Sequence, residues 1–277
     1  MTTITILGQG AMGSRIADRL DAAGHSVTRW NRTGATQTPR EAVSGAAIAI
    51  AVLRDHDAAR SVWLDPDSGA LAGLAPGTIA IESSTLTQDF VRELGAACAG
   101  RDVSFLDAPV LGSRPQAEAG QLIHLVGGDE AVLAQTQAVF DVLGARQLHV
   151  GPVGAGTALK LIANTLFGVQ VAIVAELMGR METLGLDPAR GIDLLGQTPQ
   201  LSPAAQGAAA LMVAGRDAPM FPVDLVAKDF GYAIGDDPSA MPVADAVRGV
   251  FMRASASGMG SENLTAVRRL YLPKHAS

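Results

Sequence analysis

A glycine-rich turn near the N-terminus constrains the fold of this chain more than any other sequence feature. The residues Gly8-Gln9-Gly10-Ala11-Met12-Gly13 follow an apolar segment of strand length and open a stripe of apolar residues at helical spacing. In this G-x-G-x-x-G pattern the first glycine permits a tight turn, the second lets the backbone approach a pyrophosphate, and the third allows close packing of helix on strand. The helix N-terminus then faces the phosphates. We predict that Gly8, Gln9, Gly10, Ala11, Met12 and Gly13 bind a dinucleotide; the alternative is a turn with a structural role only.

The first half of the chain alternates segments of strand and helix character. Ala46–Leu53 is apolar throughout, which is typical of a parallel strand covered on both faces. Helices are expected at Gln88–Ala99 and Glu130–Leu143. This alternation predicts βαβ units in a right-handed, doubly wound sheet of Rossmann type, hence an α/β fold. The expected strands are Thr2–Leu7, Ser26–Trp30, Ala46–Leu53, Thr78–Glu82, Val103–Asp107, Gln121–Gly127 and Arg146–Val150.

The pattern changes after a cluster of glycines and a proline at Gly151–Gly156. Thr157–Leu184 lacks proline and is apolar almost all round, which predicts a buried helix of about seven turns, roughly 40 Å long. The remainder reads as helices broken by prolines, without a strand pattern. We therefore predict a dinucleotide-binding domain of Rossmann type at residues 1–153 and an all-α domain at 154–277, joined by the long helix. That helix is expected to pack against a second copy of the chain in a homodimer.

Composition excludes several classes of function. The formal net charge is −6 and no run of Lys or Arg exceeds two residues, which argues against nucleic acid or an anionic membrane as a main partner. Cys98 is the only cysteine, so we expect no disulfide and no metal site. The first apolar segment lacks the basic region of a signal peptide, and no apolar run reaches the length of a membrane span. A soluble, cytoplasmic protein is expected.

The end of the second expected strand indicates which dinucleotide binds. Chains that bind NAD place an acidic residue there, about 20 residues after the glycines, to hold the ribose 2′-hydroxyl. This chain has Asn31, Arg32 and Thr33 instead. Arg32 can hold a 2′-phosphate through paired, charge-assisted hydrogen bonds, and its neighbours can add more. We predict NADP (NADPH) as cofactor, against the alternative of a solvated turn arginine, and also assign Val52 and Leu53 to its site.

Lysine is unusually rare in this chain. Of its 21 basic residues 18 are Arg, and the three lysines are Lys160, Lys228 and Lys274. Lys160 and Asn164 stand four residues apart, hence on one face of the long helix. An unpaired ammonium inside an apolar helix is costly. Lys160 therefore either extends to solvent or faces a cleft.

Four motifs, in this order, resemble those of the β-hydroxyacid dehydrogenase family, which includes 3-hydroxyisobutyrate dehydrogenases and glyoxylate/succinic semialdehyde reductases. They are Gly8–Gly13, Asp107–Ser113, Gly154–Asn164 and Lys228-Asp229, and the resemblance covers nearly the whole chain. It implies an NADPH-dependent oxidoreductase acting on CH–OH groups, which transfers hydride between nicotinamide and a small aldehyde, ketone or β-hydroxyacid. It also implies roles for five residues: Lys160 as proton donor and acceptor, Asn164 orienting the substrate, Thr85 near the nicotinamide, Lys228 closing over the cofactor, and Phe221 lining the substrate pocket.

The chain departs from the family pattern at its substrate motif. Leu111 stands where the family has a serine that contacts the substrate carboxylate, and Ser113 replaces a glycine. The stretch Gly112–Leu122 is closer to the glyoxylate/succinic semialdehyde reductases. We assign Leu111, Gly112, Ser113 and Phe221 to the substrate. The segment between Thr33 and Ala46 is short for the family, which leaves the wall on the adenine side in question.

Two other functions compete with this interpretation. Imine reductases resemble this chain in fold and share the Asn-Arg-Thr signature, but a cationic iminium substrate would be repelled by the ammonium of Lys160. A nucleotide-sensing scaffold without turnover is the non-enzyme alternative, and the presence of Lys160, Asn164 and Lys228 argues against it. The five histidines show no partner spacing for histidine-based dehydrogenase chemistry. The sequence leaves open the substrate, the direction of reaction and any assembly beyond a dimer.

Overall fold

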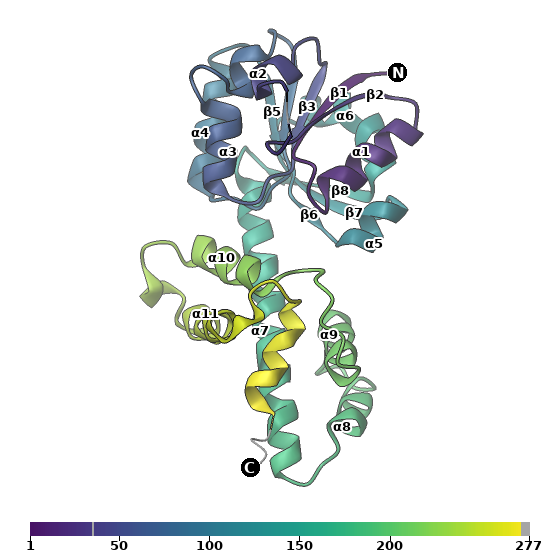
Figure 1. Ribbon diagram of the computed structural model, residues 1–277, viewed down its shortest axis with the longest axis vertical. Coiled ribbons are helices and arrows are strands. Elements are labelled where there is room, and N and C mark those ends of the chain that lie inside the picture. The colour runs from purple at the N-terminus through teal and green to yellow at the C-terminus, as the bar shows by residue number, and fades with distance from the viewer. Residues whose placement is uncertain (35, 273–277) are drawn as a thin grey trace. The chain divides into compact units, whose positions relative to one another are not determined.

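The computed structural model describes residues 1–34 and 36–272, and the chain divides into two compact units, Met1–Lys160 and Leu161–Ser277 (Figure 1). Lys274 and His275 lie outside the described residues. The division falls a few residues after the predicted domain boundary. The domain bounds 1–153 and 154–277 themselves remain a prediction.

The first unit is built on one sheet, which has eight strands within the described residues. Its order is β2-β1-β3-β4-β5-β7-β6, with β8 beside β7. The strands from β2 to β5 are parallel, whereas β7 runs antiparallel to both β5 and β6. The carboxyl ends of β1 and β3 are neighbours where the strand order reverses, and doubly wound sheets bind their ligands at such a point. The strands are β1 (Thr3–Leu7), β2 (Ser26–Trp30), β3 (Ile48–Ala51), β4 (Ile79–Glu82), β5 (Ser104–Asp107), β6 (Val110–Leu111), β7 (Leu122–Gly128) and β8 (Gly144–Gly151).

Both faces of the inner parallel strands β1, β3 and β4 are buried, whereas the edge strand β2 is mostly exposed; on the inner strands the residues alternate in size between the faces. Isoleucines such as Ile6 and Ile50 pack with α1 and α6, whereas small residues such as Ala49 and Ala80 face α3 and α4. Helices accordingly cover the sheet on two sides (Figure 1). The continuous apolar runs in the sequence arise from this double coverage. The helices are α1 (Gly13–Ala22), α2 (Pro39–Ala42), α3 (His56–Leu64), α4 (Gln88–Ala99), α5 (Arg114–Ala119) and α6 (Glu130–Leu143).

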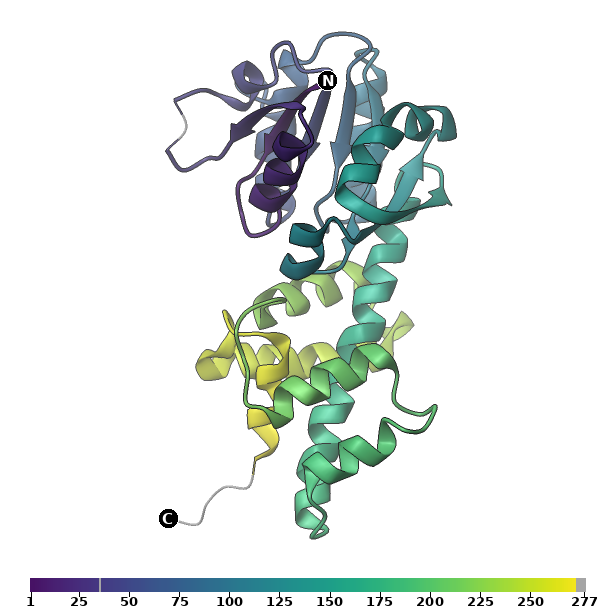
Figure 2. The same cartoon turned by 90° about the vertical axis from the view of Figure 1, so that its right-hand side faces the viewer.

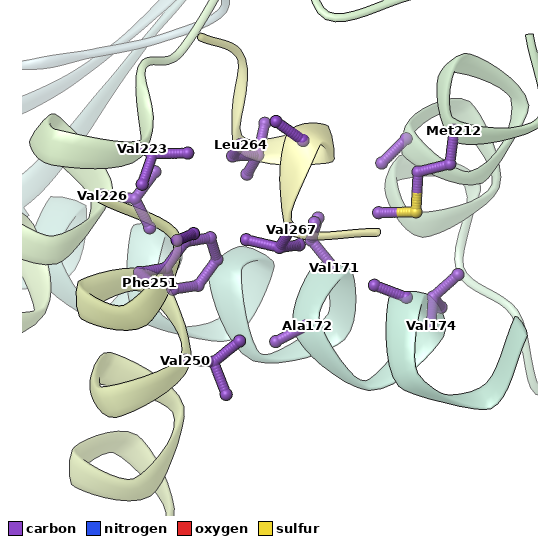
Figure 3. Close-up of a cluster of buried hydrophobic side chains, with 14 of the residues drawn as sticks. Val171, Ala172, Val174, Met212, Val223, Val226, Val250, Phe251, Leu264 and Val267 are labelled. Atoms are coloured by element: carbon purple, nitrogen blue, oxygen red, sulfur yellow. The ribbon is translucent and has the colours of Figure 1, made fainter. Parts of the chain in front are cut away.

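The second unit is helical, as predicted. Proline is the first residue of α8, α9 and α11, a position where its missing N–H costs nothing. In the core of the second unit, residues of α7 such as Val171 pack with Phe251 of α11 and with Val267 near the C-terminus (Figure 3). The elements are the part of α7 (Ala155–Thr183) that follows Lys160, α8 (Pro188–Leu195), α9 (Pro203–Val213), α10 (Val223–Ile234), α11 (Pro242–Ala254) and the short helical segments η3 (Ser255–Met259) and η4 (Leu264–Tyr271).

The long helix α7 is continuous from Ala155 to Thr183 (Figure 2), close to the predicted Thr157–Leu184. One side of it is buried, but Ile162, Leu166, Ile173 and Leu177 are between 45% and 60% exposed. Their spacing places these four side chains on one stripe of the helix. By length and composition α7 alone, within the part of the chain that the structure describes, could cross a membrane. Core helices of soluble proteins pass the same test, so this is weak evidence for a membrane span.

Candidate active site

The glycine-rich turn between β1 and α1 has the shape that a dinucleotide requires. Gly8 has a φ of +104°, and a Cβ there would lie 2.3 Å from the carbonyl oxygen of Val52. A Cβ on Gly13 would lie 2.1 Å from the carbonyl oxygen of Gly8. Beside Gly10, in contrast, no described atom lies within 4 Å of that position. The outer glycines are therefore needed for packing, and the middle one leaves the backbone accessible to a pyrophosphate, so these residues fit the cofactor.

A surface cavity of about 230 Å³ lies at the carboxyl end of β2. Asn31 and Thr33 line it, whereas Arg32 is exposed and is not among the described lining residues. Arg29 does line it, and its guanidinium pairs with Asp18 at 2.5 Å and Asp21 at 3.0 Å. The described lining residues include no carboxylate, so nothing among them would repel a 2′-phosphate. They are Gln9, Arg29, Trp30, Asn31, Thr33, Gly34, Thr36 and Gln37.

A buried carboxylate that the sequence analysis did not assign connects the loops after β3 and β4. Glu82 accepts hydrogen bonds from the indole Nε1 of Trp63 and the backbone N–H of Ser84, both at 2.7 Å. The hydroxyl of Ser84 in turn accepts the backbone N–H of Leu53 at 2.7 Å. Burial raises the pKa of Glu82 to about 7. Through Ser84 it holds Leu53, and the half-buried Thr85 directly follows Ser84.

The predicted substrate residues of the first unit come from β6 and the start of α5. Leu111 is half-buried on β6, paired with Ile123 of β7. Gly112 has a φ of +117°, which favours glycine. Ser113 caps α5, and its backbone N–H donates to the side chain of Gln116 at 2.9 Å. The same unit ends at Lys160, whose side chain is buried at 8% exposure on the second turn of α7.

In the second unit, Asp229 is the centre of a small polar network. The amide Nδ2 of Asn164 donates to its Oδ2 at 2.6 Å, and Nζ of Lys228 lies 2.9 Å from its Oδ1. Lys228 also lies over the ring of Tyr232, 4.4 Å from the centroid. Asp229 itself was not assigned a role from the sequence, although it belongs to the quoted Lys-Asp motif. Phe221 is partly buried against the helical core, and its backbone N–H donates to Asn263 at 3.0 Å.

The most buried histidine is structural. His124 of β7 packs on the ring of Phe140, with centroids 4.8 Å apart, and burial lowers its pKa to about 4. It is therefore uncharged at neutral pH and lies in the core of the sheet. Among the described residues, no group of three or more His, Cys, Asp or Glu side chains could hold a metal ion.

Two sequence families match the chain, one to each half. Residues 3–151 match the NAD binding domain of 6-phosphogluconate dehydrogenase. Residues 154–271 match the NAD-binding region of NADP-dependent 3-hydroxyisobutyrate dehydrogenase. The described substrate and cofactor motifs are distributed over both regions.

Curated relatives match nearly the whole chain. Glyoxylate/succinic semialdehyde reductase 1 of Arabidopsis thaliana is 33% identical over 279 residues, which is 95% of this chain and 96% of the relative. The cytokine-like nuclear factor N-PAC of Mus musculus is 32% identical over 97% of this chain. The match spans only 51% of N-PAC, so this chain corresponds to about half of that protein.

Solved structures agree with this relationship. A 3-hydroxyisobutyrate dehydrogenase of Mycobacterium tuberculosis, solved with L-serine, has a TM-score of 0.88 at 27% identity, covering 98% of this chain and 99% of that one. An imine reductase from Pseudomonas sp. shares the fold at a lower TM-score of 0.61 and 20% identity, covering 97% and 98% of the two chains. The motifs, the fold and the relatives agree: this chain is an oxidoreductase of the β-hydroxyacid dehydrogenase family, whose enzymes are NAD(P)-dependent and act on CH–OH groups.

Proposed function

We propose that this protein is an NADPH-dependent oxidoreductase that transfers hydride between nicotinamide and a small aldehyde, ketone or β-hydroxyacid, with Lys160 as its proton donor and acceptor. The observation that carries this proposal is the burial of Lys160, at 8% exposure, near the start of α7. Burying an ammonium group costs free energy, and this chain carries most of its positive charge on arginine. The buried position of Lys160 therefore supports a functional role for it. Asn164 follows one helical turn later and is equally buried.

The proposed chemistry assigns one role to each group. When bound, the cofactor supplies hydride to the carbonyl carbon of the substrate. Nζ of Lys160 donates its proton to the carbonyl oxygen as negative charge develops there, and accepts it back in the oxidative direction. Asn164 orients the substrate without transferring a proton. Thr85 and Lys228, together with Val52, Leu53 and the glycine-rich turn, bind the cofactor.

We assign the preference for NADPH over NADH to Arg32, Asn31 and Thr33. Support comes from the described lining of the cavity at the end of β2, which is polar and lacks a carboxylate. Arg32 lies between two lining residues and is exposed. A long arginine side chain at that position can reach a 2′-phosphate after a change of rotamer.

For the substrate, we propose contacts with Leu111, Gly112, Ser113 and Phe221. Leu111 replaces a hydroxyl donor with an apolar wall, so the grip on a substrate carboxylate is weaker at this position. This change favours one of two kinds of substrate: a neutral or longer aldehyde, or an acid whose carboxylate is held by Ser113 or Arg114. Both the relative named as a glyoxylate/succinic semialdehyde reductase and the neighbour solved with L-serine make small acids the first substrates to test.

The test is NADPH oxidation against a panel of glyoxylate, succinic semialdehyde, methylmalonate semialdehyde and a cyclic imine. The expected result is turnover of at least one carbonyl compound, with the imine slower. Faster reduction of the imine would favour the imine reductase alternative. No NADPH consumption with any member would favour the scaffold alternative, which gains interest because one curated relative is named as a nuclear factor rather than an enzyme.

We also propose a homodimer formed through the exposed stripe of α7. Ile162 and Leu166 are each 60% exposed, and apolar side chains in such a row are stabilised when a second surface covers them. Light scattering at micromolar concentration should give twice the chain mass. Leu166→Asp should yield monomers, whereas Leu186→Asp, at an equally exposed position outside the helix, should not. A monomeric native chain would overturn this assignment.

A cytoplasmic location of the protein also remains a prediction.

A further inference from the structure

Asp107, at the carboxyl end of β5, caps a helix that begins 48 residues later in the chain. Its Oδ1 accepts the backbone N–H of Gly154 at 2.7 Å, and its Oδ2 accepts that of Thr157 at 2.7 Å. These residues are the ones just before and within the first turn of α7. Asp107 is fully buried, at 0% exposure, and all of these groups belong to the first unit.

The start of α7 needs this distant cap because it cannot supply one locally. The first N–H groups of a helix have no partner within the helix, and a Ser, Thr, Asp or Asn side chain usually accepts one of them. Here the residue before the helix is Gly154, with a φ of +90° and no side chain. The carboxylate of Asp107 therefore accepts two of these N–H groups at once, and the positive end of the helix dipole favours its charge.

The surroundings leave the carboxylate no freedom to move. A Cβ on Gly127 would lie 2.3 Å from Oδ1 of Asp107, so β7 passes directly against it. A Cβ on Gly156 would lie 2.2 Å from the carbonyl oxygen of Leu125, so the first turn of α7 also lies directly against β7. Burial raises the pKa of Asp107, and the N–H donors of Gly154 and Thr157 oppose that shift. The strand, the carboxylate and the first helical turn thus form one closely packed joint.

We propose that Asp107 is a positioning residue: by fixing the first turn of α7 against β5, it sets where Lys160 presents its ammonium. Lys160 follows Thr157 by three residues, so it belongs to the next turn of the same helix. The inference rests on the proposed role of Lys160 in catalysis. Small displacements of a catalytic group cost up to about 100-fold in rate.

The rarity of lysine allows a test that does not depend on activity. Protein labelled with ¹³Cε-lysine should give one signal for each of Lys160, Lys228 and Lys274, assigned by single Lys→Arg variants. Asp107→Asn keeps the size of the side chain but presents an NH₂ group to one of the two N–H donors. We expect this variant to shift or broaden the signal of Lys160 and to leave the other two in place.

Asp129→Asn is the matched control. Asp129 caps α6 in the same unit, accepting the N–H of Ala131 at 2.7 Å, but it is exposed and the helix that it caps is not α7. It should leave the Lys160 signal unchanged. An unchanged Lys160 signal in Asp107→Asn, or an equal change in Asp129→Asn, would overturn the proposal.

Activity provides the second measurement. Asp107→Asn should lower kcat for the best carbonyl substrate by about 10- to 100-fold. The Kd for NADPH should change less than about twofold, and the primary isotope effect on kcat with deuterated NADPH should rise as the chemical step becomes slower. A merely less stable protein would keep the native isotope effect.

A native kcat in Asp107→Asn, when Lys160→Ala is inactive, would overturn the positioning role while the proposed function stands. If the native chain is inactive on every carbonyl, the proposed function is refuted. The lysine signals would still show whether Asp107 fixes the position of Lys160.

Should Asp107→Asn not fold, amide exchange in the native chain decides the question. The buried amides of Gly154 and Thr157 should exchange at least about 10-fold more slowly than that of Ala131, which is bonded to the exposed Asp129. Equal rates would show that Asp107 does not hold the helix start.

Discussion

The side-chain amide of Asn164 donates a hydrogen bond of 2.6 Å to the buried carboxylate of Asp229. The other oxygen of that carboxylate lies 2.9 Å from Nζ of Lys228, the residue we assign to the cofactor. One carboxylate thus fixes both a proposed substrate residue and a proposed cofactor residue. The bond also identifies which end of the Asn164 amide is nitrogen, so its Oδ1 points away from Asp229.

Asn164→Ala should therefore affect stability more than chemistry. The substitution leaves Oδ2 of the buried Asp229 without its donor, which should cost about 1–3 kcal/mol in the free energy of unfolding measured with urea. Turnover should fall by less than in Lys160→Ala, because Asn164 transfers no proton. Gln197→Ala, which removes an exposed amide, is the control and should change stability by less than about 0.5 kcal/mol. A loss of turnover equal to that of Lys160→Ala would refute the orienting role.

Arg32→Ala should abolish most of the preference for NADPH. A charged, partly exposed pair with its hydrogen bonds contributes about 1.5–3 kcal/mol, or about 10- to 150-fold in affinity for the 2′-phosphate. The ratio of kcat/KM for NADPH and NADH measures the change. Arg29→Ala is an informative comparison, since Arg29 lines the cavity but is already paired with Asp18 and Asp21. Equal use of both cofactors by the native chain would refute the assignment.

Leu111→Ser restores the hydroxyl that the family pattern has at this position. It should raise kcat/KM for acidic substrates relative to neutral ones, because a hydroxyl can donate to a carboxylate and a leucine side chain cannot. The direct measurement is kcat/KM for glyoxylate or succinic semialdehyde against a neutral aldehyde of similar length. If the ranking of acidic and neutral substrates does not change, Leu111 does not set specificity.

Glu82 should make the fold less stable as the pH rises. Its folded pKa is about 7, against 4.5 for an unperturbed carboxyl group. Stability from this group is therefore complete below pH 4.5 and is lost as the pH rises through 7, by about 3 kcal/mol in all. Urea unfolding between pH 4.5 and 8 should show a smaller decline for Glu82→Gln than for the native chain. His124 has the opposite effect: because its pKa is lowered, the fold loses stability as the pH falls from 6.5 toward 4. This effect is the same in the native chain and in Glu82→Gln. Parallel profiles would rule out a titrating Glu82.

Local patterns in the sequence were sufficient to predict several elements. The structure places α4 and α6 at the predicted Gln88–Ala99 and Glu130–Leu143. In each case a side chain just before the helix, Thr87 or Asp129, caps it. The turn between β1 and α1 was predicted for a similar reason, because its glycine spacing has few other structural explanations.

Features that depend on distant partners could not be predicted in this way. The antiparallel direction of β7 is set by its pairing with β5 and β6, which the pattern of apolar residues within β7 does not encode. The helix α3 was missed because it has only nine residues, although Asp55 caps it. In the sequence, Asp107 was recognisable only as the first residue of a family motif and Glu82 only as an acidic residue at a strand end. Their partners, Gly154 and Trp63, lie 47 and 19 residues away in the chain.

Lys160 carries the most decisive prediction. It is one of three lysines, is buried, and lies near the start of the helix whose first turn Asp107 holds. Lys160→Ala should lower kcat by about 10²–10⁴-fold, the usual contribution of a general acid. The variant should still bind NADPH, because the proposed phosphate contacts come from other residues.

Two further variants separate proton transfer from charge at this position. Lys160→Arg should not restore turnover, since a guanidinium cannot readily release a proton at neutral pH. Lys228→Arg is the matched control: Lys228 is also paired and partly buried, but its proposed role requires only positive charge, so the variant should retain much of the native kcat. If Lys160 were a structural residue of the helix, Lys160→Ala would retain near-native turnover with the best substrate. In that case the proton must come from another group, and the role of Asp107 in presenting this lysine would lose its catalytic meaning.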